Sequence, residues 1–89
     1  MRYSPSCASL AIRQLGEEVL VFNPASGSTH VLSDAALVVL RGLLDAPGPT
    51  DSQALGLALL GEASDAELRG IGAMLEEFTR LGLAETRPS

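Results

Sequence analysis

Few side chains in this sequence have the chemistry that catalysis or metal binding requires. His30 is the only histidine, Cys7 is the only cysteine, and lysine is absent. A Cys/His or Ser/His/acid catalytic arrangement would have to combine the N-terminal segment, expected to be flexible, with a strand. Such a pair does not hold a nucleophile beside its base. A metal site needs three or four convergent ligands, and no spacing of His, Cys and carboxylates provides them. We therefore expect no enzyme activity, no metal and no cofactor.

Three further sequence features could have either a structural or a functional role. Gly70-Ile71-Gly72 is expected inside a helix and lacks the rest of a nucleotide-binding fingerprint. The pair Glu76-Glu77 is typical of a solvated helix face, with contact to a basic peptide as the alternative. Met74 is typical of a core, although a flexible thioether also suits the edge of an adaptable apolar groove. None of the three predicts a reaction.

Length and charge limit the class of protein. A chain of 89 residues is expected to form one domain, here residues 1–89. The formal net charge is −5, and the whole excess lies in residues 45–89, which hold eight acidic residues and three arginines. An acidic surface repels phosphate backbones and anionic lipid. We therefore expect neither nucleic acid nor a membrane surface as a partner.

Cysteine content and hydropathy indicate a cytoplasmic protein. A single cysteine cannot form an intrachain disulfide, which fits a reducing compartment. No apolar run reaches the roughly 18 residues of a membrane span, and residues 1–5 lead into no signal-type apolar stretch. The expected location is the cytoplasm.

Three strands are expected in the N-terminal third, at residues 9–15, 18–22 and 28–32. The second is almost entirely apolar, which is typical of a central strand with a neighbour on each side. The turn before the third strand, residues 23–27, is rich in Asn, Pro, Ser and Gly. The third strand is then a free edge, and it carries neither a charge at neutral pH nor a proline to prevent further pairing.

Two helices are expected next. Ser33 caps the first, residues 34–45, which is so apolar that we expect it to be buried on most sides. A proline-glycine break ends it. Thr50 has capping-box spacing to Gln53 and opens the second helix, which ends near Gly61.

The third helix has the clearest pattern. Ser64 and Glu67 form a capping box, and the helix runs to about Leu81, with Gly82 as the residue after its end. Apolar residues at helical spacing form its buried stripe, namely Leu68, Ile71, Leu75 and Phe78. Met74 and Leu81 lie on one shoulder of this stripe, and Gly72 and Thr79 lie on the other.

The predicted fold class is α+β, with a three-stranded antiparallel sheet followed by three helices in a winged-helix-like arrangement. Residues 1–7 are expected to be flexible, and residues 83–87 to be extended at most. DNA binding through the third helix is disfavoured because that helix has a net charge of −2 from Asp65, Glu67, Glu76, Glu77, Arg69 and Arg80.

The stretch VLVFNPASGSTHVLSDAALVVLRGLLD, together with the later LEEFTRLGLAE, resembles the PqqD-like peptide chaperones, also called RiPP recognition elements. Within that group the segment FNPASGSTHVLS is most similar to the branch encoded beside an HPr-kinase-related protein, the HPr-rel-A system. The resemblance covers nearly the whole chain. Its most specific part is NPASGSTHVL, whereas the helices match as an apolar pattern.

The resemblance implies a non-catalytic function. Such proteins hold the leader of a ribosomally made precursor peptide and present its core to modifying enzymes, here the HPr-kinase-related protein and other enzymes of the system. The leader would lie as a fourth strand between the third strand and the third helix. The implied backbone contacts are Ser28, Thr29, His30, Val31 and Leu32. The implied pockets are Met74, Phe78 and Leu81, or Gly72 and Thr79 on the opposite shoulder, and the sequence leaves the choice of shoulder open.

Two other uses of the molecule remain open. The free edge at residues 28–32 can equally pair with its twin in a homodimer. The chain can also be a structural subunit that docks on a kinase-like or nucleotidyltransferase-like partner. The precursor peptide and its modification are not encoded in this sequence.

Overall fold

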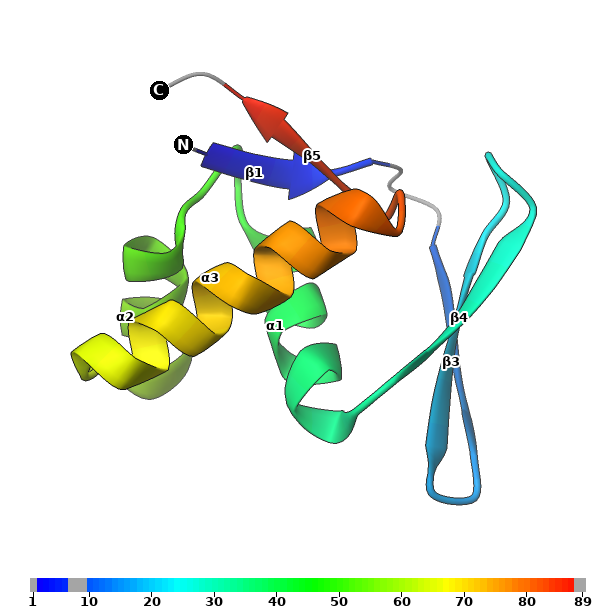
Figure 1. The fold of residues 1–89 in the computed structure, drawn as a ribbon, viewed down its shortest axis with the longest axis horizontal. Helices are drawn as coiled ribbons and strands as arrows, with labels where there is room; N and C mark the ends of the chain where they lie inside the picture. Colours follow the sequence, from blue (N-terminus) through cyan, green and yellow to red (C-terminus); the bar gives the residue numbers. More distant parts are fainter. Residues whose placement is uncertain (1, 7–9, 88–89) are drawn as a thin grey trace.

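The structure, a computed structural model, describes residues 2–6 and 10–87. Two small sheets and three helices make up this part of the chain (Figure 1). The elements in chain order are β1 Arg2–Pro5, β2 Ala11–Leu15, β3 Glu18–Asn23, β4 Ser28–Leu32, α1 Asp34–Asp45, α2 Ser52–Leu60, α3 Asp65–Arg80 and β5 Ala84–Arg87.

The expected three-stranded antiparallel meander is present, with strand order β2-β3-β4 and the apolar strand β3 in the middle. Gly16 and Gly27 have φ values of 63° and 73°, which suits the two turns between these strands. β2 begins at Ala11, whereas the start expected at Ser9 lies outside the described residues, as does Cys7.

A second sheet was not expected from the sequence. β1 pairs antiparallel with β5, so that Arg2 lies opposite Arg87 and Pro5 opposite Ala84. The prediction that residues 1–7 are flexible is therefore wrong for Arg2–Pro5, and residues 84–87 form a strand. The physical reason is Tyr3, whose buried side chain belongs to the core and holds β1 against the helices.

The helix caps follow the sequence at two of three positions. Ser33 caps α1 by accepting a hydrogen bond from the N–H of Ala36, and Ser64 caps α3 within the predicted capping box. The cap predicted for α2 is wrong by one residue, since Asp51 accepts the bond from Ala54 at 2.8 Å. Thr50 is extended instead, because its main chain bonds to Tyr3.

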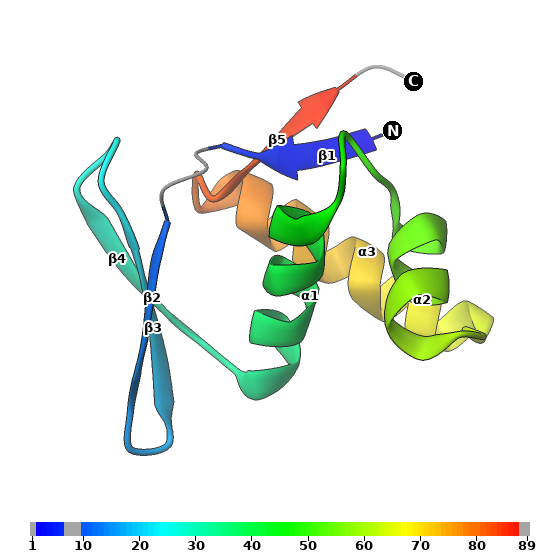
Figure 2. The ribbon, with the colours of Figure 1, turned by 180° about the vertical axis from the view of Figure 1, so that it is seen from behind.

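The core lies among the three helices and the two-stranded sheet of β1 and β5, and Val21 and Leu32 join it from the three-stranded sheet. The largest fully buried side chains come from α1, α3, β3 and the residue before β5, namely Phe78, Leu40, Leu43, Leu75, Leu83, Val19 and Val21. Helix α3 lies in front of α1 and α2 in Figure 1 and behind them in Figure 2, while the three-stranded sheet stands beside the helices.

Helix α3 ends in a Schellman motif that starts β5. Gly82 has a φ of 81°, its N–H donates to the carbonyl of Thr79 at 3.2 Å, and the N–H of Leu83 donates to the carbonyl of Phe78 at 2.8 Å. Leu83 is fully buried beside Phe78 in the same cluster. The predicted position of Gly82 after the helix end is thus confirmed. None of the helices in the described ranges has both the length and the apolarity to cross a membrane.

Candidate functional site

The outer edge of β4 is the first part of the candidate site. In the three-stranded sheet β4 has β3 on one side, and within residues 2–6 and 10–87 no strand pairs with its other side. The sheet order, together with the appearance of β2 in front in Figure 2, places this edge on the same side of the molecule as α3.

The main-chain direction at this edge follows from the β3–β4 turn. The carbonyl of Asn23 accepts a hydrogen bond from the N–H of Gly27 at 2.8 Å, so the main-chain groups of Asn23 point towards β4. These directions alternate along a strand, so Val21 also points towards β4 and bonds its opposite residue, His30. The N–H and C=O groups of Thr29 and Val31 are consequently left pointing outward.

The two edges of the sheet differ in their protection against pairing. β2, at the far edge, carries Arg13, and charged side chains on an edge discourage the addition of another strand. β4 has the sequence STHVL, with neither proline nor a residue that is charged at neutral pH. β4 is therefore the edge that is open to an additional strand.

The side chains of β4 alternate between two faces of the sheet. Leu32 is buried, and His30 and Ser28 are half-buried on the same face, where His30 Nε2 lies 3.1 Å from Ser28 Oγ. Thr29 and Val31 point to the opposite face, and Val31 is 63% exposed. His30 is thus a half-buried strand side chain on the same face of the sheet as the buried Leu32.

The outer face of the sheet is also apolar. Val31 lies opposite Leu20, and Thr29 lies opposite Phe22, which is 41% exposed. An apolar central strand normally has both faces covered. Here only the inner face is packed on the helices, so a strand added to β4 would extend an exposed apolar row on the outer face.

The site residues predicted on α3 differ in how far they are buried. Phe78 is only 1% exposed and forms part of the core, so it is not accessible as a pocket wall. Met74 and Leu81 are half-buried and pack against the core cluster. Of the three implied pocket residues Met74, Phe78 and Leu81, Met74 and Leu81 therefore keep exposed surface and Phe78 does not.

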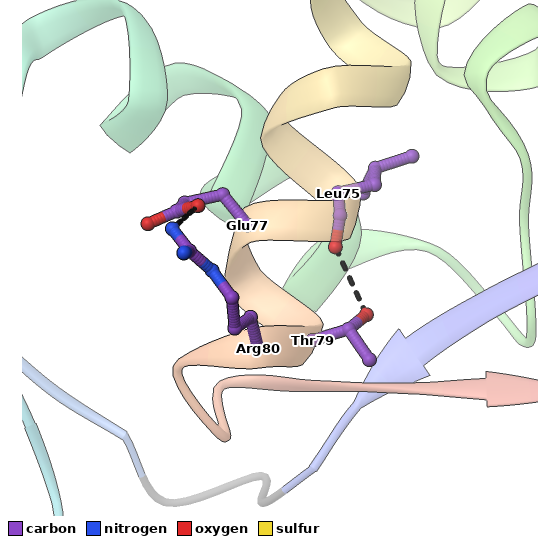
Figure 3. A network of polar contacts seen from close by, with 4 residues as sticks. All are labelled: Leu75, Glu77, Thr79 and Arg80. Atoms are coloured by element: carbon purple, nitrogen blue, oxygen red, sulfur yellow. Dashed lines mark hydrogen bonds and ion pairs between the residues drawn. The ribbon is translucent and has the colours of Figure 1, made fainter.

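The opposite shoulder of α3 turns away from α1. Thr79 donates its hydroxyl to the carbonyl of Leu75 at 2.9 Å, and Figure 3 shows it on the other side of the helix from the ion pair of Glu77 with Arg80. Gly72 lies near Ser52 at the start of α2, beside an open, polar depression. The part of this shoulder at Gly72 therefore faces the start of α2.

An apolar groove lies on the first shoulder. It has a volume of about 380 Å³ and is formed by α1, the end of α2 and α3, with the lining residues Ala35, Val38, Val39, Leu59, Leu60, Glu67, Gly70, Ile71 and Met74. Val38 and Leu60 are 52% and 50% exposed. Met74 is thus the predicted site residue that the groove contains.

Sequence reasoning missed the α1 and α2 walls of this groove. We expected α1 to be buried on most sides, but Val38 is exposed, because α2 and α3 cover only part of the helix. An apolar side chain on the solvent side of an apolar helix was the available signal. The groove begins three residues after β4, since Ala35 follows Leu32 across the cap residue Ser33.

Titratable groups contribute little to this site. Glu67, at the rim of the groove, has its pKa lowered below the ordinary value because the Ser64 main chain and then the Ser64 hydroxyl bond its carboxylate. In the part of the chain that the structure describes, no group of three or more His, Cys, Asp and Glu is placed to hold a metal ion. The site offers main-chain bonds and apolar contacts.

No protein-family model, no curated protein and no solved structure matches this chain.

Proposed function

We propose that this chain is a non-catalytic, cytoplasmic peptide-binding module with the winged-helix-like arrangement of the PqqD-like peptide chaperones. It binds the leader of a precursor peptide by adding it as a strand to β4. The single observation that supports this proposal is the open edge of β4, where no described strand pairs with the outward main-chain groups of Thr29 and Val31 and no charge or proline protects them.

In the proposed binding mode, main-chain and side-chain contacts make different contributions. Main-chain hydrogen bonds to Thr29 and Val31 supply affinity without reading sequence. Alternate side chains of the peptide reach the two faces of the sheet. On the outer face they continue the row of Leu20 and Val31, which favours a β-branched or aromatic residue there. On the inner face they lie next to His30 and Leu32.

The partners of the module are proposed from the sequence resemblance. The bound leader would be presented to an HPr-kinase-related protein and to other modifying enzymes of the same system. An uncharged edge and an acidic C-terminal half do not attract nucleic acid.

The experiment compares one substitution on each edge of the sheet. Val31→Pro removes an outward N–H of β4, and Gln14→Pro makes the same change on the edge strand β2, where Gln14 lies opposite Val19. Peptides are selected from a random display library on the unmodified protein and measured by fluorescence anisotropy. Val31→Pro should weaken binding by at least about tenfold, and Gln14→Pro should not.

A further control separates main-chain from side-chain effects. Val31→Thr keeps both the N–H and the β-branched shape, so it should retain most of the affinity. Equal affinity of Val31→Pro and the unmodified protein would contradict strand addition at β4.

The competing use of the edge is a homodimer through β4. It rests on the same unpaired groups, and it predicts a two-fold symmetric pairing of β4 with its copy. Sedimentation velocity with and without a selected peptide distinguishes the two. A dimer that the peptide does not dissociate, and that Val31→Pro does, would favour the homodimer.

A further inference from the structure

We propose that the peptide bound along β4 also places an apolar residue, next to a basic one, in the groove between α1, α2 and α3. This inference rests on the proposed strand addition, and it adds a second contact that determines which peptides bind. The groove is defined by Ala35 and Val38 of α1, Leu60 of α2, and Gly70 and Met74 of α3.

The groove has the size and lining of a side-chain pocket. Its volume of about 380 Å³ lies at the lower end of the range for ligand sites. Among the described residues that line it, Glu67 is the only charged one, and the other walls are aliphatic side chains, Met74 and Gly70. The exposure of Val38 and Leu60 leaves apolar surface in water that an apolar ligand side chain would cover.

The position of the groove indicates which part of the peptide reaches it. Leu32 ends β4, and Ala35 of the groove follows three residues later, so their Cα atoms are at most about 11 Å apart. Antiparallel addition, the direction used throughout this sheet, sends the amino-terminal side of the peptide past Leu32. An extended chain covers that distance in about three or four residues. The anchor therefore precedes the paired segment by this spacing.

The charge around the groove indicates a basic neighbour for the anchor. Glu67 contributes a carboxylate at the rim, where the capping bonds to Ser64 favour its ionised form. Asp34, also exposed, adds a second carboxylate in the first turn of α1, next to Ala35. A peptide with Lys or Arg beside its apolar anchor satisfies both features, whereas an acidic neighbour would be repelled.

The test fills the groove without disturbing the fold. A Cβ at Gly70 would meet no atom of the described chain within 4 Å, so Gly70→Leu projects into the groove from an unobstructed position. Ala73→Leu is the matched control, because it introduces the same side chain at an exposed position of α3 that lines a different depression and not the groove. The probe is the peptide from the random display library that binds most tightly. It is made in two forms, one complete and one that lacks the residues on the amino-terminal side of the segment paired with β4.

A spectroscopic reporter locates the contact. The sequence contains two methionines, Met1 and Met74, so a methyl-labelled sample has one methionine signal from the groove. With the complete peptide we expect the Met74 methyl signal to shift, Gly70→Leu to weaken binding by about tenfold, and Ala73→Leu to have no effect. With the truncated peptide we expect no Met74 shift and no effect of Gly70→Leu.

The outcomes separate the two proposals. If Gly70→Leu binds the complete peptide as tightly as the unmodified protein does, the groove is not a peptide site, while a loss with Val31→Pro still supports strand addition. If Val31→Pro leaves binding unchanged, or no peptide is selected, strand addition fails and this inference fails with it. A Met74 shift that depends on protein concentration without peptide would assign the groove to a second copy of the chain and overturn the inference.

Discussion

The side chain of Asn23 donates a hydrogen bond from Nδ2 to the carbonyl of Gly82 at 3.1 Å. This bond joins the end of β3 to the second residue after α3, although the two positions are far apart in the sequence. Asn23 also accepts a bond from the N–H of Ala25 through Oδ1 at 3.0 Å, and it is buried. The hairpin that carries the proposed binding edge is thereby fixed to the end of α3.

Asn23→Ala should lower the free energy of unfolding by about 2 kcal/mol. The substitution removes the buried amide side chain that accepts from the N–H of Ala25 and that is one of the donors to the carbonyl of Gly82. Urea denaturation measures the loss. Ser26→Ala, at an exposed position of the same turn, should change stability by less than about 0.5 kcal/mol. Equal losses for both variants would show that the bond to Gly82 does not fix the hairpin.

Tyr3→Ala should cost about 3 kcal/mol of stability. Tyr3 is buried in the core, and its main chain exchanges hydrogen bonds with Thr50, with N···O distances of 2.6 and 2.8 Å. Truncating a buried aromatic residue removes its contacts and leaves a cavity. Arg2→Ala, its exposed neighbour, is the control for denaturant unfolding. An unchanged midpoint for Tyr3→Ala would mean that β1 is not part of the cooperative unit.

Two glycines should respond with opposite signs to the same substitution. A Cβ at Gly56 would lie 2.8 Å from Leu68 Cδ2 and 3.0 Å from Ala63 Cβ, so Gly56→Ala should destabilise the protein by about 1 kcal/mol despite the better helix propensity of alanine. Gly70 has no such neighbour among the described residues, so Gly70→Ala should stabilise it by about 0.5–1 kcal/mol. Thermal unfolding compares the two, and stabilisation by both would exclude close packing at Gly56.

The capping box of α3 should make the free energy of unfolding depend on pH in the acidic range. The main chain of Ser64, and then its hydroxyl, lower the pKa of Glu67 below its ordinary value of 4.5. A carboxyl with a lower pKa in the folded state adds stability above the pKa of the unfolded chain, and this contribution is lost as the pH falls through the folded value. Glu67→Gln keeps an acceptor but does not titrate. The stability difference between the two proteins, from denaturant curves at several pH values, should therefore shrink below pH 4.5.

The opposite pH dependence would contradict the capping role of Glu67. A difference that grows as the pH falls would mean that the carboxyl is protonated more readily in the folded state. Ser64→Ala removes the hydroxyl but keeps the main-chain N–H that bonds the carboxylate, so in that background the difference should depend less on pH but still change with it.

Local patterns in the sequence predicted much of the fold. The alternation and turn residues of residues 18–32 predicted β3 and β4, because hairpin pairing is local. Ser33 and the Ser64–Glu67 box predicted the starts of α1 and α3, since caps depend on side chains three residues apart. The free edge at β4 followed from the same local reading.

Only the tertiary structure determined the rest. β1 and β5 are short strands at opposite ends of the sequence, and neither has a pattern until the burial of Tyr3 brings them together. The cap of α2 moved from Thr50 to Asp51 because Thr50 bonds to β1. Val38 stayed exposed because the angle between helices, which no periodicity encodes, decides which apolar face is covered.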